Sequence, residues 1–156
     1  MFIEQIAHLD DTCKYQLSRI KRTLTGKQID LYQYLDDYLS AYCNYNELDC
    51  GDVLRIRNKF FQRYIKDINN FEKYGKYPYQ LQCEQFEITR IEYDVILIIS
   101  FLLEKHRFEI AQWLVRHTFE ETLLSIGVGS GIELGLIKEY SGCNMPLTGY
   151  DLDLSD

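Results

Sequence analysis

Apolar residues recur at spacings of three and four along most of the chain, a pattern typical of helices that bury one face. Over residues 2–24 this stripe is interrupted only by Asp10, so a single amphipathic helix is expected, ended by Gly26. The same spacing returns over residues 28–47 and predicts a second helix.

A turn around Gly51 separates that helix from a third one. Asp52 is a candidate N-cap, because an aspartate carboxylate can accept a hydrogen bond from an N–H group of the first helical turn. The helical pattern then continues to about Tyr74, where Gly75 and Pro78 supply the stop.

The densest apolar run of the chain lies in a fourth helix, which is predicted to begin near Gln85. Between Val95 and Leu103 apolar residues occupy nearly all sides of this helix, which predicts that it is buried. The helix continues past this run, or a further helix starts at His106. Residues 2–118 are therefore expected to form four or five helices without strands.

The pattern changes at Phe119. Residues 122–126 (TLLSI) are typical of a parallel strand buried on both faces, and residues 147–151 (LTGYD) predict a second strand. A short helix between them completes one βαβ unit. The predicted fold is mainly α, with a helical domain over residues 1–118 and the start of a Rossmann-like α/β domain over residues 119–156.

Charge is distributed unevenly along the 156 residues, which carry a net charge of −7. Residues 1–118 contain 16 basic and 17 acidic residues, whereas residues 119–156 contain one basic and seven acidic residues. Because an acidic surface repels phosphate backbones, nucleic acid is not expected as a partner.

Cysteine spacing and hydropathy argue against a metal-binding, a secreted or a membrane-spanning protein. The five cysteines never form a CxxC pair and the three histidines complete no ligand set, so free thiols and no metal site are expected. The chain begins without a secretory leader pattern, and its longest apolar run, which starts at Val95, is too short for a membrane span. A cytoplasmic protein with no membrane partner is expected.

Three alternating glycines, Gly127, Gly129 and Gly131, lie between the first predicted strand and the following helix. Such a turn lets the backbone approach a ligand closely and directs helix N–H groups toward it. The dinucleotide fingerprint GxGxxG needs a small residue where this chain has Ile132, and the Gly-Lys-Ser/Thr of a P-loop is missing.

The segment LLSIGVGSG, followed about twenty residues later by LTGYDLD, resembles the first two motifs of class I S-adenosylmethionine-dependent methyltransferases. The resemblance implies that the glycine loop passes beneath the methionyl and sugar parts of S-adenosylmethionine. It also implies that Asp151 accepts hydrogen bonds from both ribose hydroxyls, with Asp153 as a weaker candidate. Ser125 stands where the family usually has an acidic residue, and its hydroxyl can accept from the cofactor's amino group without neutralising it.

This resemblance covers about 35 residues and implies the N-terminal part of a longer methyltransferase, with the catalytic residues beyond residue 156. A small-molecule methyl acceptor is the expected substrate. The helices would then cover the site, select the acceptor or form a homodimer. An exposed strand edge of the incomplete sheet is the other candidate contact for a homodimer. Two alternatives are transfer of an aminobutyl group from the same cofactor and a non-enzymatic helical interaction module.

The helical part offers little other chemistry. His106 and His117 are candidate general bases by residue type alone. A basic stripe on the third predicted helix is either a solvated face or a contact for an acidic acceptor. Its members are Arg55, Lys59, Arg63 and Lys66.

Overall fold

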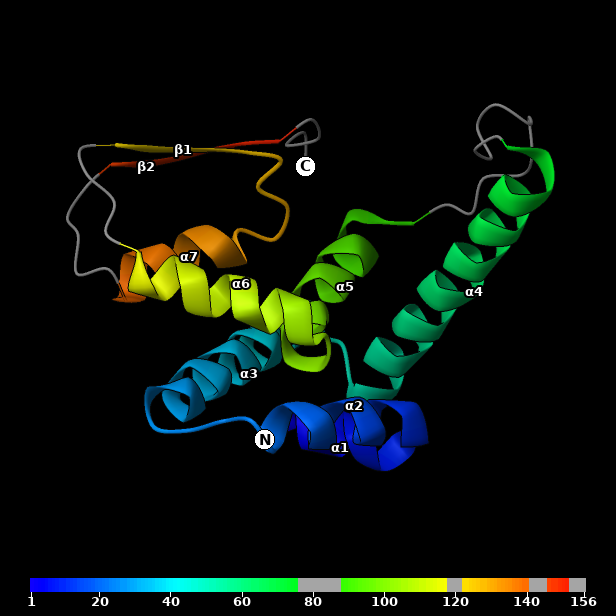
Figure 1. Cartoon of the computed structure of the whole chain (residues 1–156), viewed down its shortest axis with the longest axis horizontal. Helices are drawn as coiled ribbons and strands as arrows, with labels where there is room; N and C mark the ends of the chain where they lie inside the picture. Colours follow the sequence, from blue (N-terminus) through cyan, green and yellow to red (C-terminus); the bar gives the residue numbers. More distant parts are fainter. Residues whose placement is uncertain (76–87, 118–121, 141–145, 152–156) are drawn as a thin grey trace.

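The computed structural model describes residues 1–75, 88–117, 122–140 and 146–151 (Figure 1). This part of the chain is mainly helical and carries one small sheet, so the predicted mainly α class is confirmed at that level. The elements are α1 (Phe2–Leu9), α2 (Asp11–Lys21), α3 (Lys27–Tyr45), α4 (Cys50–Tyr74), α5 (Arg90–Leu103), α6 (Lys105–Arg116), β1 (Leu123–Ile126), α7 (Ile132–Tyr140) and β2 (Leu147–Tyr150).

The single helix predicted over residues 2–24 is wrong, because Asp10 divides it into α1 and α2. Asp10 has an extended backbone, with φ −147° and ψ 121°, and its carboxylate accepts a hydrogen bond from the Cys13 N–H at 2.7 Å. Gly26 does not end this segment either. It precedes α3 as its N-cap with φ 49°, whereas α2 already stops at Lys21.

The start of α4 also differs from the prediction. Asp49, not Asp52, is the N-cap: its carboxylate accepts from the Asp52 N–H at 2.8 Å, and the Asp52 carboxylate accepts from the Asp49 N–H at 3.2 Å. This reciprocal pair is a capping box, in which the first residue caps and the fourth assists. Gly75 ends α4 in the left-handed conformation, as predicted, and Pro78 lies outside the described residues.

The fourth predicted helix is α5, whose expected start near Gln85 lies outside the described residues. The Thr89 hydroxyl accepts a hydrogen bond from the Glu92 N–H and caps α5. At Glu104 the backbone becomes extended, with φ −107° and ψ 116°, and a separate helix α6 begins. In the described part of the chain, six helices therefore precede the sheet, one more than the upper end of the predicted range.

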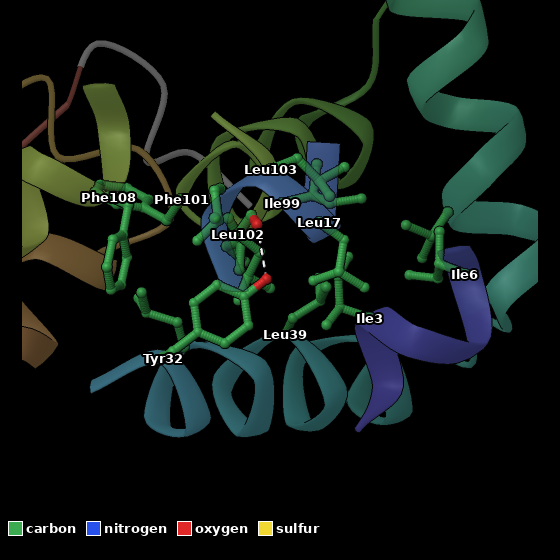
Figure 2. Close-up of a cluster of buried hydrophobic side chains, with 14 of the residues drawn as sticks. Ile3, Ile6, Leu17, Tyr32, Leu39, Ile99, Phe101, Leu102, Leu103 and Phe108 are labelled. Atoms are coloured by element: carbon green, nitrogen blue, oxygen red, sulfur yellow. Dashed lines mark hydrogen bonds between the residues drawn. The ribbon is translucent and has the colours of Figure 1, made fainter. Parts of the chain in front are cut away.

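The core lies around α5, which contacts α2, α3, α4 and α6. Side chains from several helices meet there, and Figure 2 shows the Tyr32 phenol donating to the Leu102 carbonyl at 2.7 Å. The Tyr32 ring also meets the Phe108 ring edge-on at a centroid distance of 5.6 Å. In the described residues, no helix is both long and apolar enough to cross a membrane.

The two strands pair in parallel, with Leu123 opposite Leu147 and Ile126 opposite Tyr150. The predicted burial of the first strand on both faces is wrong, because Ile126 is 82% exposed and Leu124 is 58% exposed. Among the described elements, α7 makes the main helix contact with the sheet, and the face that carries Leu124 and Ile126 is exposed.

Helix α7 connects this small sheet to the rest of the molecule. It packs against α6, and Figure 1 shows both strands on the same side of α6 and α7. Ile132 and Leu136 of α7 belong to the same buried cluster as the core of the preceding helices. The glycine loop is thereby held against the helical part of the protein.

Candidate cofactor site at the glycine loop

The glycine loop has a backbone that favours glycine at three positions. Gly127, Gly129 and Gly131 have φ values of 71°, 52° and 74°, a left-handed region that side chains disfavour. The Gly127 N–H donates to the Tyr150 carbonyl at 2.7 Å, and the Gly131 N–H donates to the Val128 carbonyl at 3.0 Å. These bonds tie the loop to the end of β2 and turn the chain into α7.

Asp151 follows β2 directly and meets the loop. Its Oδ2 accepts a hydrogen bond from the Gly129 N–H at 2.7 Å. The glycine loop and Asp151, both candidate cofactor-binding residues from the sequence, are therefore in contact. They meet at the carboxyl ends of two parallel strands, which is where ligands of open α/β sheets bind. Asp153 lies outside the described residues.

Ser125 is placed within β1, opposite Gly149, and is half-buried. It lies one residue before the end of the strand, whereas Asp151 lies beyond the end of β2. The structure therefore puts Ser125 in the ladder and Asp151 at the loop.

Arg90, the first residue of α5, joins the loop to the helical part. Its Nη2 donates to the Gly129 carbonyl at 2.7 Å and lies 3.6 Å from Asp151 Oδ2, and its Nε lies 3.2 Å from Asp94 Oδ2. Burial lowers the pKa of the Arg90 guanidinium, but Asp94 and Asp151 outweigh this and leave it above its usual value. The sequence analysis did not identify Arg90. The one signal for it in the sequence is that a basic residue stands at the start of a buried helix.

Two tyrosines of α3 support this arrangement from below. The Tyr42 phenol donates to Asp94 Oδ2 at 2.9 Å, and the Tyr38 phenol donates to the Ser130 carbonyl at 2.9 Å. Burial, followed by the hydrogen bond to Asp94, raises the pKa of Tyr42. Burial, followed by Asp94 and Glu133, raises the pKa of Tyr38. Both phenols therefore remain donors at neutral pH.

Leu97 covers the middle glycine of the loop. A Cβ on Gly129 would lie 2.5 Å from Leu97 Cδ1, whereas one on Gly127 or Gly131 would meet nothing within 4 Å. The group that lies close to the Gly129 backbone is thus the Leu97 side chain. The outer two glycines face open space.

Beside Asp151 lies a hollow of about 490 Å³ between α4 and the start of α5, here called the outer hollow. Asp151 and Arg90 line one side of it, and Phe60, Arg63 and Tyr64 of α4 line the other. A volume of this size suits a small molecule. The remaining described residues that line it are Asp67, Ile88, Thr89 and Tyr93.

Three members of the predicted basic stripe are paired with carboxylates. Arg55 lies 2.8 Å from Asp52, Lys59 lies 2.8 Å from Glu92, and Arg63 lies 3.6 Å from Asp67. Of the stripe's members, Arg63 lines the outer hollow. The two candidate bases, His106 and His117, are not among the described residues that line it.

The described cysteines are free thiols: Cys13 and Cys43 are buried and Cys50 is half-buried. Burial raises the pKa of Cys13 to about 11 and that of Cys43 to about 12, so neither is a thiolate at neutral pH. Cys83 and Cys143 lie outside the described residues. Within the described ranges, no group of three or more His, Cys, Asp or Glu side chains is placed to hold a metal.

Comparison with known proteins adds no relative: no family model, no curated protein and no solved structure matches the chain. The site is therefore interpreted from its own geometry. The Asp151 carboxylate accepts a hydrogen bond from the Gly129 N–H and lies 3.6 Å from Arg90 Nη2. Its place on the wall of a molecule-sized hollow fits the binding of a diol such as ribose.

Proposed function

We propose that this chain is the N-terminal part of an S-adenosylmethionine-dependent methyltransferase that acts on a small-molecule acceptor. The observation that carries the proposal is the contact between Asp151 and the Gly129 N–H at the carboxyl ends of two parallel strands, beside the outer hollow. The match of LLSIGVGSG and LTGYDLD to the family motifs supports it.

In this proposal Asp151 accepts the two ribose hydroxyls, because an ionised carboxylate is a stronger acceptor than water for paired O–H donors. Gly127 and Gly131 leave the backbone open to the ligand, since nothing lies within 4 Å of their would-be Cβ positions. Ser125, within β1 and two residues before Gly127, would be the counterpart of the family's acidic residue. When bound, S-adenosylmethionine would supply a methyl group on a positively charged sulfur.

The first prediction concerns Asp151. Replacement by alanine removes the ribose acceptor and should weaken binding of S-adenosylhomocysteine by about 1–3 kcal/mol, the range for hydrogen bonds to a charged group. Titration calorimetry on the chain measures this. Asp67→Ala is a matched control, because Asp67 also lines the outer hollow and also pairs with an arginine there.

Equal affinities of Asp151→Ala and Asp67→Ala would contradict the site assignment. Absence of any S-adenosylhomocysteine binding to the native chain would contradict the proposed function and is the result expected of a helical interaction module. Circular dichroism of each variant separates loss of binding from loss of fold.

A further inference from the structure

A second hollow adjoins the outer one and is here called the inner hollow. It has a volume of about 430 Å³ and lies between α4, α5 and the start of α6. Phe60 and Tyr64 line both hollows, so the two are neighbours along α4. The walls of the inner hollow are mostly apolar, formed by Phe61, Ile96, Ile99 and Leu103.

Arg57 is a buried charge on the wall of the inner hollow. It is 5% exposed, and among the described residues its guanidinium makes one hydrogen bond, from Nη2 to Gln16 Oε1 at 2.8 Å. The nearest carboxylate, that of Asp10, is 3.9 Å from Nη1, and the Phe61 ring centroid is 4.7 Å from Cζ.

A guanidinium carries five N–H donors, and a buried charge is costly unless it is paired and hydrogen-bonded. One short hydrogen bond and one long ion pair leave donors of Arg57 for a further acceptor. Because Arg57 lines the inner hollow, an acceptor placed there can meet these donors.

The other charged groups on the wall limit the charge of that acceptor. Glu104 also lines the inner hollow and accepts a hydrogen bond from Gln16 Nε2 at 3.0 Å, so Gln16 lies between Arg57 and Glu104. His106 is exposed at the same hollow. With a carboxylate already near Arg57, a single negative charge fits better than a phosphate dianion, and the planar fork of arginine matches a carboxylate.

We propose that the inner hollow binds an apolar monocarboxylate with its carboxylate on Arg57. Its apolar body lies among Phe61, Ile96 and Ile99. Its other end passes Phe60 and Tyr64 toward the outer hollow and Asp151.

In the proposed methyl transfer a hydroxyl at the other end of this acid would be the acceptor: its oxygen bonds to the methyl carbon, the bond from that carbon to sulfur breaks, the neutral thioether leaves, and the hydroxyl proton passes to water. Only the role as acceptor rests on the proposed function; the binding of the acid rests on the inner hollow itself.

The test uses 4-phenylbutyrate and its neutral amide, 4-phenylbutanamide, as probes, with binding measured by ligand-observed NMR on the whole chain. The acid should bind at least tenfold more tightly than the amide. Arg57→Met should remove this preference, and Arg57→Lys should retain part of it, since lysine keeps the charge without the fork. Glu104→Gln should tighten acid binding, because it removes a negative charge from the wall.

Arg55→Met is the control, since Arg55 lies on the same helix and pairs with Asp52 at the surface, away from the inner hollow. If Arg57→Met fails to fold, backbone amide shifts of the native chain still decide: the acid should perturb Ile96, Ile99 and Leu103 most. Equal binding of acid and amide, or perturbation elsewhere, would overturn the proposal.

The two proposals fail separately. Arg57-dependent acid binding without S-adenosylhomocysteine binding would leave the inner hollow as an acid site and remove its role as acceptor site. S-adenosylhomocysteine binding that depends on Asp151, with no acid preference, would keep the proposed function and overturn the acid site.

Discussion

Single aspartates decide how several helices of this protein begin. Asp36 of α3 is 2% exposed and accepts from the Phe2 N–H at 2.8 Å and the Ile3 N–H at 2.7 Å, so it caps α1 from a neighbouring helix. Burial raises the pKa of Asp36, although these two amides oppose the rise. Asp10, which caps α2 from the adjacent position, has its pKa lowered by the Cys13 amide.

Asp36→Ala should therefore lower the free energy of unfolding by about 2–4 kcal/mol, because two N–H groups at the start of α1 lose their acceptor. Urea denaturation followed by circular dichroism measures the change. Asp37→Ala is the matched control, since the neighbouring Asp37 is exposed and, among the described residues, accepts a surface hydrogen bond from Gln33 alone. Equal losses in the two variants would disprove the capping role.

At the scale of elements, α5 holds the glycine loop in place. Arg90 at its first turn binds the Gly129 carbonyl, and Leu97, two turns later, lies against Gly129. A larger residue at Gly129 would therefore disturb packing on α5 in addition to any ligand space. The loop and the start of α5 thus form one contact unit, joined through Arg90 and Leu97.

Arg90→Met should loosen that unit, because the Gly129 carbonyl loses a donor and the buried Asp94 loses its cation. Amide hydrogen exchange at Gly129 and Gly131 should become at least about tenfold faster, which corresponds to about 1.4 kcal/mol of local stability. Exchange in α1 should stay as in the native chain. Arg55→Met, which breaks a surface pair, serves as the comparison, and unchanged exchange at the loop would rule out the tether.

In the whole molecule, one face of the small sheet leaves apolar side chains exposed to solvent. Leu124, Ile126 and Tyr150 are 58%, 82% and 61% exposed. Parallel sheets are ordinarily covered on both faces, and open strand edges pair readily with other chains. The homodimer expected from the sequence is therefore best sought at this face.

Light scattering across a concentration series should show a rising apparent mass for the native chain. Ile126→Glu should reduce the rise, because burying a carboxylate at an apolar contact is unfavourable. Tyr45→Glu provides the control, since Tyr45 is 88% exposed at the end of α3 and not on the sheet. A strictly monomeric native chain would contradict this prediction.

Local pattern was sufficient for the existence of most elements and for part of the site. The apolar spacing predicted α3, α4 and α5, because a helix with one buried face repeats every three to four residues whatever it packs against. The sequence also predicts that Asp151 and the glycine loop lie close together, since parallel strands joined by one helix end at the same edge of the sheet. Gly75 stopped α4 as predicted because a left-handed residue suits a helix end.

The remaining features depend on residues that are distant in the sequence. Arg90 reaches Gly129 across 39 positions and Arg57 reaches Gln16 across 41 positions, and no local spacing encodes either contact. The exposure of Leu124 and Ile126 depends on which elements cover the sheet, so an apolar run alone could not predict it. Which regions become helices or strands depends on neighbouring residues, so the local pattern predicts it. Which charges are buried and paired depends on how these elements meet, so it is visible only in the folded protein.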